Sequence, residues 1–277
     1  MSDYDTAAIQ KVMVIPEENE TEGSIIGSSS APYLTALSKT YGSATNMDAG
    51  YPVSCPSLAA YILMTSGSQQ GICDDLDPSV HQITGNNIFN QVAGAGLEWR
   101  VFAESMTSNC QGTNGGAGGY LVRHTAAPYD VTEATRCQQW QVPLGTTTSG
   151  ALKTELADGL PSYSMVVANA CHEMHGASTC TTGLVAAGDN WLKTWLPRIM
   201  AGTDFTHNRL AIIITWDEGS STSNHIPTLV ISNATRGVSS ATAYTHCSNL
   251  ATVEQILDLP LLGCAATATS FVSAFHL

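Results

Sequence analysis

The sequence predicts an α/β fold in which a mostly parallel central sheet lies between two layers of helices. Short apolar runs that suit buried strands alternate along the chain with longer segments of helical periodicity. This alternation is typical of a parallel sheet that is covered by helices on both faces. No linker-like stretch or internal repeat interrupts the pattern. We therefore expect residues 1–277 to form a single domain, with a loop-rich insert at about residues 107–147.

The expected strands are apolar runs, rich in β-branched and aromatic side chains, that end at polar or turn-forming residues. In chain order they are residues 12–15, 98–103, 163–168, 211–215 and 228–232.

Helices are expected where apolar residues recur every three or four positions. Residues 32–41 place Leu34, Leu37 and Tyr41 on one face in this way. The other expected helices are residues 57–65, which Gly67 would stop, and residues 88–93, 148–156, 188–200 and 248–259.

The chain is acidic, with a formal net charge of −13 and only 10 Lys+Arg. A nucleic-acid-binding surface needs positive charge that matches the phosphates, so we expect no nucleic-acid partner. No apolar run approaches the roughly 20 residues that span a bilayer, so we expect no membrane insertion. Charged residues make up 12% of the chain, and Ser, Thr, Ala and Gly take their place. This is the composition of an exported protein, and we expect a secreted monomer.

Eight cysteines form an even set, and they fall into neighbouring pairs along the chain. No C-x-x-C spacing occurs, which disfavours a structural zinc site and favours disulfides in an oxidising compartment. Eight cysteines allow many connectivities, so pairing each with its neighbour is one hypothesis among several. This hypothesis gives Cys55–Cys73, Cys110–Cys137, Cys171–Cys180 and Cys247–Cys264.

Acidic or amide residues follow three of the expected strands. Glu18 and Asn19 follow the first strand, Asn169 follows the strand at 163–168, and Asp217 comes directly after Trp216. Because the carboxyl ends of parallel strands face a common crevice, we expect these side chains to converge.

Ser57 begins an expected helix, and the positive end of a helix dipole favours an alkoxide and a bound oxyanion. Carboxylate and amide oxygens suit Mg²⁺, Ca²⁺ or Mn²⁺, and histidines could add a zinc site. The combination indicates a metal-assisted hydrolase with a serine nucleophile.

These segments, taken in order, resemble the acid phosphatase and phospholipase C type phosphoesterases, a branch of the alkaline phosphatase superfamily. The resemblance runs nearly end to end and implies an alkaline-phosphatase-like, three-layer αβα fold. The matching segments are Glu17-Glu18-Asn19, Pro56-Ser57-Leu58, Arg123-His124, Asn169-Ala170-Cys171, Met174-His175, Gly188-Asp189, Trp216-Asp217-Glu218-Gly219, Asn224-His225-Ile226-Pro227 and Tyr244-Thr245-His246.

The resemblance also implies a role for each matching site residue. The nucleophile would be Ser57, activated by a divalent metal ion whose identity among Mg, Ca, Mn and Zn stays open. The ligands of that ion would be Glu18, Asn19, Asp217 and Glu218. The phosphate would be contacted by His124, His175 and His225. The substrate would be a small-molecule phosphoric ester.

The chain departs from the family pattern around the expected anion site. The family's Pro-Asn after the nucleophile is Ala59-Ala60, and that Asn donates hydrogen bonds to the phosphoryl oxygen. A family histidine is replaced by Glu20 and another by Cys55, while Gly176 replaces an aspartate. These changes add negative charge or remove donors. Two alternatives therefore stand beside phosphoric-ester hydrolysis: action on an uncharged ester or specialised small molecule, and a catalytically silent relative that binds a ligand.

The same residues also have purely structural interpretations. Ser57 could simply cap its helix, since serine is preferred at the N-cap. Asp217 and Glu218 could form a solvated turn, and His175 could stabilise the loop that a Cys171–Cys180 disulfide would close.

Overall fold

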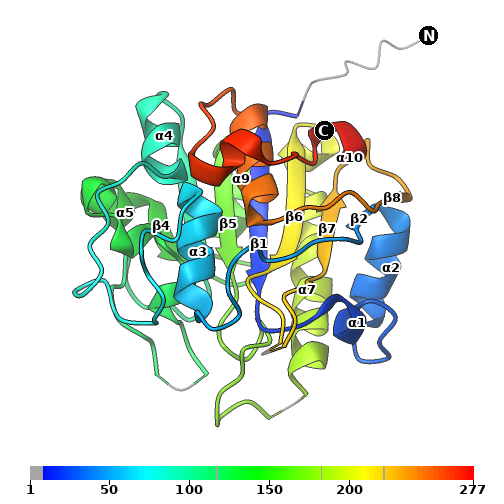
Figure 1. Ribbon diagram of the computed structural model, residues 1–277, viewed down its shortest axis with the longest axis horizontal. Coiled ribbons are helices and arrows are strands. Elements are labelled where there is room, and N and C mark those ends of the chain that lie inside the picture. Colours follow the sequence, from blue (N-terminus) through cyan, green and yellow to red (C-terminus); the bar gives the residue numbers. More distant parts are fainter. Residues whose placement is uncertain (1–8, 117, 182, 221) are drawn as a thin grey trace.

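Eight strands form one mixed sheet through the middle of the molecule in the part of the chain that the structure describes (Figure 1). The structure is a computed structural model that describes residues 9–116, 118–181, 183–220 and 222–277. The strand order is β4-β3-β5-β1-β6-β7-β2-β8. The strands are β1 (Lys11–Glu17), β2 (Gly42–Ala44), β3 (Trp99–Ala103), β4 (Gln141–Pro143), β5 (Tyr163–Val167), β6 (Leu210–Trp216), β7 (Thr228–Ile231) and β8 (Val238–Ser240).

The sheet is parallel except at β7, which pairs antiparallel with both β6 and β2. The central strand β1 lies between β5 and β6 and is parallel to both. Every residue of β5 and β6 is buried, as expected for strands that are covered on both faces. This arrangement sends the carboxyl ends of β1, β5 and β6 to one edge of the sheet.

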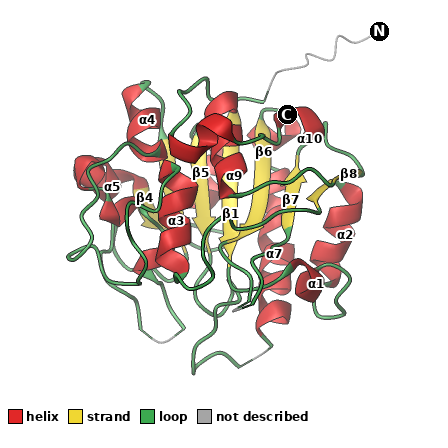
Figure 2. Ribbon diagram, viewed as in Figure 1, coloured by secondary structure: helices red, strands yellow, loops and turns green. Residues whose placement is uncertain are grey.

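Helices cover both faces of this sheet (Figures 1 and 2). The helices α3 (Ser57–Ser66) and α9 (His246–Ile256) pack against each other in front of the sheet as drawn, and α7 (Leu184–Met200) runs behind it. The remaining helices are α1 (Glu22–Ile25), α2 (Pro32–Thr40), α4 (Ile88–Gly94), α5 (Ala134–Trp140), α6 (Ala151–Asp158), α8 (Thr203–Thr206) and α10 (Val272–Phe275), with short 3₁₀ turns η1 (Val122–His124), η2 (Ala127–Tyr129), η3 (Val131–Glu133) and η4 (Gly263–Thr267). The predicted three-layer α/β fold is confirmed.

Several local expectations differ from the structure. The strand predicted at 228–232 runs antiparallel to both of its neighbours. The sequence could not show this, because a run of apolar residues carries no information about strand direction. The helix α7 begins at Leu184, four residues before the predicted start, and α6 begins at Ala151 rather than at 148. The segment 107–147, expected as a loop-rich insert, contains α5 and also β4, which pairs with β3 at the edge of the sheet.

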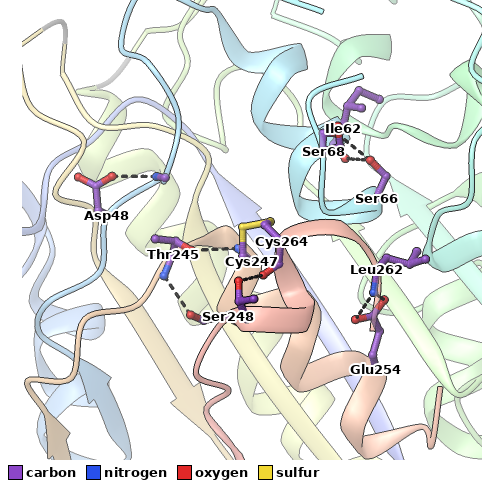
Figure 3. The surroundings of a disulfide bond; sticks show 12 residues. Asp48, Ile62, Ser66, Ser68, Thr245, Cys247, Ser248, Glu254, Leu262 and Cys264 are labelled. Carbon is purple, nitrogen blue, oxygen red and sulfur yellow. Dashed lines mark hydrogen bonds between the residues drawn. A yellow bond between two sulfur atoms is a disulfide. The ribbon is translucent and has the colours of Figure 1, made fainter. Parts of the chain in front are cut away.

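All eight cysteines are paired as the neighbour hypothesis predicted: Cys55–Cys73, Cys110–Cys137, Cys171–Cys180 and Cys247–Cys264. Figure 3 shows the last of these, which joins the first turn of α9 to η4. In the same view, Thr245 accepts a hydrogen bond from the Cys247 amide at the start of α9, and Glu254 accepts one from the Leu262 amide. The carboxyl-terminal segment is thereby fastened to α9, which lies over β1.

None of the helices in the described ranges combines the length and the apolar character that crossing a bilayer requires.

Candidate active site

Two predicted acidic segments meet where β1 and β6 end. The two strands run in register, with Glu17 opposite Trp216, so the next residues on each strand lie side by side. The Asn19 amide donates to Oδ1 of Asp217 at 3.2 Å, and the Asn19 side chain donates to Oε2 of Glu18 at 3.2 Å. Both Glu18 and Asp217 are fully buried.

Ser57 enters this group from the helix α3. It is the first residue of that helix, and Pro56, not Ser57, occupies the N-cap position. Ser57 is 3% exposed, and its hydroxyl donates to Oε2 of Glu18 at 3.1 Å. The buried serine therefore points at a carboxylate of the neighbouring strand end, and it does not cap its own helix.

His124 and His175 lie on the other side of Glu18. One ligand atom from each of these three residues lies within 4.8 Å of the others. His124 contacts Oε1 of Glu173 through Nδ1 at 2.8 Å, and its buried Nε2 has no hydrogen-bond partner among the described residues. His175 contacts the Gly176 carbonyl through Nδ1 at 2.9 Å.

The side chains of Glu218 and His225 have hydrogen-bond partners outside the predicted set. Glu218 accepts a hydrogen bond from the Tyr51 hydroxyl at 2.7 Å. The His225 Nε2 contacts the Thr45 carbonyl at 3.1 Å. Contacts join seven of the eight predicted residues to one another, and within the described ranges no hydrogen bond joins the His225 side chain to this group.

Three side chains that the sequence analysis did not assign complete the site. Tyr61 donates to Oε1 of Glu18 at 2.7 Å, and its ring stacks on His124 with centroids 5.1 Å apart. Glu173 forms a hydrogen bond with His124, and His246 contacts the Asp217 carbonyl at 2.6 Å through Nε2. Tyr61 could have been found, because it is four residues after Ser57 and so shares its helix face.

Burial dominates the electrostatics of these groups. It raises the pKa of Asp217 to about 7, and repulsion from Glu218 adds to the shift. It raises the pKa values of Glu18 and Glu173 well above the ordinary range, with repulsion from Asp217 as the next cause. Burial lowers the pKa of His124 well below its ordinary value, which disfavours the charged ring.

The residues present fit a divalent cation. Buried carboxylates that repel one another favour a positive ion between them, and the described residues leave Oδ2 of Asp217 and Nε2 of His124 buried without hydrogen-bond partners. The contact from His124 to Glu173 resembles the carboxylate–histidine pairs that orient metal-bound histidines. The oxygen donors of Glu18, Asn19, Asp217 and Glu218 suit a hard ion, while the histidines beside Glu18 suit zinc.

The departures from the family pattern have local structural consequences. Ala59 and Ala60 are fully buried, and the methyl group at 60 brings no hydrogen-bond donor to the site. The Glu20 carboxylate accepts a hydrogen bond from the Ser24 hydroxyl at 2.6 Å and is engaged with α1. Gly176 has a φ of +89°, and a Cβ there would come within 2.8 Å of the Leu184 side chain. An aspartate at this position would therefore be strained.

A cavity of ≈ 300 Å³ lies beside these residues. Asn19 and Glu218 line it, together with residues 53–56, the turn that leads into Ser57. A second groove of ≈ 320 Å³ lies between α6, α7 and α8, near the segments that lead into β5 and β6. Ligands of open α/β sheets bind at the carboxyl ends of the strands, so the first cavity is the better candidate for a substrate.

Comparison with known proteins relates the chain to phosphate-ester chemistry. The sequence model of the Phosphoesterase family matches residues 23–260. The phosphatidylinositol-3-phosphatase of Mycobacterium tuberculosis is 30% identical over 258 residues, which are 93% of this chain and 80% of that protein.

Solved structures share the fold at much lower identity. A protein in the alkaline phosphatase superfamily from Vibrio parahaemolyticus has a TM-score of 0.62 at 14% identity, with 92% of this chain and 67% of that chain covered. The C-terminal periplasmic domain of EcEptC from Escherichia coli, in complex with Zn, has a TM-score of 0.51 at 12% identity, with 94% and 85% covered.

Proposed function

Because the chain belongs to the Phosphoesterase family and is a hydrolase acting on phosphate esters, we propose that it uses Ser57 as its nucleophile with the help of a divalent metal ion. The observation that carries this proposal is the position of the Ser57 hydroxyl. It lies buried at the start of α3 and hydrogen-bonds Glu18, in the midst of the unpartnered donor atoms of Asp217 and His124.

The residues that would hold the ion are Glu18, Asn19, Asp217 and Glu218, and His124 and His175 lie beside Glu18 as further ligands. When bound, such an ion lowers the pKa of a hydroxyl nucleophile and stabilises negative charge on phosphoryl oxygens.

The chain's own residues set up two displacements at phosphorus. Ser57 Oγ attacks phosphorus and loses its proton, the ester P–O bond breaks, and the departing alkoxide takes up a proton to leave as the alcohol. Water then attacks the phosphorus of the phosphoserine, the P–Oγ bond breaks, inorganic phosphate leaves, and Ser57 Oγ takes up a proton to restore the hydroxyl. The helix N-terminus behind Ser57 favours both the alkoxide and the bound phosphoryl group.

We propose a small-molecule phosphate monoester as the substrate. The cavity of ≈ 300 Å³ is at the small end of ligand pockets, and the relative named as a phosphatidylinositol-3-phosphatase acts on a phosphate ester. The alternative substrate, an uncharged ester, is supported by Ala60, because this residue offers no hydrogen-bond donor to a charged phosphoryl group. The alternative of a catalytically silent relative does not account for the buried hydrogen bond between Ser57 and Glu18.

The test combines metal analysis of the purified protein with a panel of p-nitrophenyl phosphate, bis(p-nitrophenyl) phosphate and p-nitrophenyl acetate. We expect one or more divalent ions per chain, hydrolysis of the monoester, and its loss in Ser57→Ala. Preferred hydrolysis of the acetate would instead favour the uncharged-ester function. Full phosphatase activity in Ser57→Ala would exclude Ser57 as the nucleophile.

We also propose that the protein is secreted and works as a monomer. Four disulfides suit an oxidising compartment, which supports secretion. Fractionation of producing cells should recover the protein outside the cytoplasm, and light scattering should give the mass of one chain. Recovery from the cytoplasm with free thiols would refute secretion, and a dimer mass would refute the monomer.

A further inference from the structure

Arg123 is the one Lys or Arg in the described part of the chain that hydrogen-bonds or ion-pairs with a predicted site residue. Its Nη2 lies 3.1 Å from Nε2 of His175. The other cations with ion pairs are engaged elsewhere, for example Lys11 and Arg209 with Asp204 and Arg136 with Glu133. The permanent positive charge that the chain places at its phosphate-ester site therefore rests on this side chain.

Asp75 holds Arg123 beside the nucleophile. Its Oδ2 lies 3.1 Å from Nε of Arg123, while its Oδ1 accepts a hydrogen bond at 3.0 Å from the amide of Leu58, the residue after Ser57. The two oxygens of one carboxylate thus join the arginine to the first turn of α3.

A disulfide strengthens this connection. Cys55 lies two residues before Ser57, and its partner Cys73 lies two residues before Asp75. The bond therefore fixes the turn that precedes the nucleophile to the loop that carries the arginine's partner.

The guanidinium retains donors for a ligand. An arginine carries five N–H donors, and the contacts to Asp75 and His175 account for only part of them. The side chain is 14% exposed, so it is largely desolvated yet still reachable. Among the described residues its buried Nε forms no hydrogen bond, although an Asp75 oxygen is close.

The charge of the site calls for such a group. A phosphate monoester brings up to two negative charges toward Glu18, Asp217 and Glu218, and the family's asparagine donor is missing at Ala60. Arginine compensates well, because its planar fork matches two phosphoryl oxygens at once.

We propose that Arg123 binds the phosphoryl oxygens of the substrate and selects anionic phosphate esters over neutral ones, with Asp75 as its positioning residue. This inference rests on the proposed function, since it assumes that the phosphoryl group lies next to Ser57. It assigns to one arginine the donor role that Ala60 lacks.

The experiment compares metal-loaded wild type with Arg123→Gln, Arg123→Lys, Arg123→Ala and Asp75→Asn. Arg136→Gln is the matched control, because it removes an arginine whose ion pair lies outside the site. Metal content and thermal midpoint are measured for every variant. The readouts are the dissociation constant of inorganic phosphate by calorimetry and kcat/KM for p-nitrophenyl phosphate.

We expect Arg123→Gln to weaken phosphate binding about ten-fold or more and to lower kcat/KM about 10²-fold, comparable to the loss of one oxyanion donor. Arg123→Lys should be intermediate, Asp75→Asn should raise KM more than it lowers kcat, and Arg136→Gln should match wild type. Added guanidinium ion should partly restore the phosphate binding and kcat/KM of Arg123→Ala. A merely structural role of Arg123 would not allow this rescue.

Phosphate binding within about two-fold of wild type in a folded, metal-loaded Arg123→Gln overturns the inference, and so does an Arg123→Ala that guanidinium does not rescue. Should Arg123→Gln fail to fold, the dissociation constant of inorganic phosphate is compared between Arg123→Lys and wild type. Binding within about two-fold of wild type then overturns the inference. Failure of the proposed function has a different signature, namely full activity in Ser57→Ala.

Discussion

At the scale of single residues, the site depends on a few side chains around Glu18. Its Oε2 accepts from Ser57 and its Oε1 accepts from Tyr61, so both oxygens of this one carboxylate are oriented by residues of α3. The convergence of Glu18, Ser57 and Asp217 was predictable, because the sequence pattern shows where strands end and where helices begin. The partners Tyr61 and Glu173 were not assigned, because a buried aromatic or acidic side chain looks the same in a sequence whether or not it supports a site.

Tyr61→Phe tests this support. The substitution removes the hydroxyl that donates to Glu18 and keeps the ring that stacks on His124. Loss of such an outer partner should cost about 10- to 100-fold in metal affinity or activity. The control is Tyr129→Phe, which deletes the hydroxyl of an equally buried tyrosine that donates to the Leu76 carbonyl. Equal effects of the two variants on metal affinity and kcat/KM would contradict the assignment of Tyr61.

At the scale of elements, α3 positions Ser57, the proposed nucleophile. Its start was predicted at Ser57, and Gly67 ends it in a left-handed conformation, as the sequence indicated. The segment around 107–147 was harder to predict, since its Gly- and Asn-rich start suggests loop. That segment nevertheless supplies Arg123 and His124 from the turn η1, which packs against α3. Only the tertiary contact between η1 and α3 places Arg123 and His124 beside Ser57, because sequence periodicity indicates local structure alone.

Gly67→Ala should destabilise the helix end. Gly67 has a φ of +69°, and a Cβ there would lie 2.4 Å from the Leu262 carbonyl oxygen. Left-handed backbone alone costs an alanine about 1–2 kcal/mol, and the backbone clash adds to this. We expect the melting temperature to fall by roughly 4 °C or more. Gly94→Ala is the control, because a Cβ at Gly94 meets nothing within 4 Å. A melting temperature for Gly67→Ala that matches the control would contradict this account.

At the scale of the whole molecule, the predicted fold, the four disulfides and the family are confirmed, because many ordered motifs specify a topology even where single motifs are weak. The sequence did not predict the direction of β7, the short strands β2 and β8, or the contact of His225 with the Thr45 carbonyl. A three-residue strand is too short for a period to show, and a histidine's reach depends on how the loops around it pack.

Stability of the metal-free protein should depend on pH in a defined sense. The folded pKa of Asp217, about 7, and those of Glu18 and Glu173 lie above their unfolded values near 4. The folded state therefore binds these protons more tightly than the unfolded chain does. Their contribution to stability is complete below about pH 4 and is lost as the pH rises through the folded pKa values.

We expect the melting temperature of the metal-stripped protein to carry a component that falls between about pH 4 and 8, and this component should be smaller in metal-stripped Asp217→Asn. A divalent ion should raise the melting temperature more at pH 8 than at pH 5, because ligands must be deprotonated to bind it. Thermal scans over this range, with and without the ion, make the comparison. An equal shift at both pH values, together with the same slope in Asp217→Asn, would contradict the proposed ligand set.

The central claim is that Ser57 carries the phosphoryl group during turnover. Rapid acid quenching of the enzyme with p-nitrophenyl phosphate, followed by mass spectrometry of the proteolytic peptides, tests it most directly. The account predicts a phosphoryl group on the peptide that contains Ser57, and none on the same peptide of Ser57→Ala. Turnover under these conditions with every peptide unmodified, or with the phosphoryl group on another residue, would contradict it.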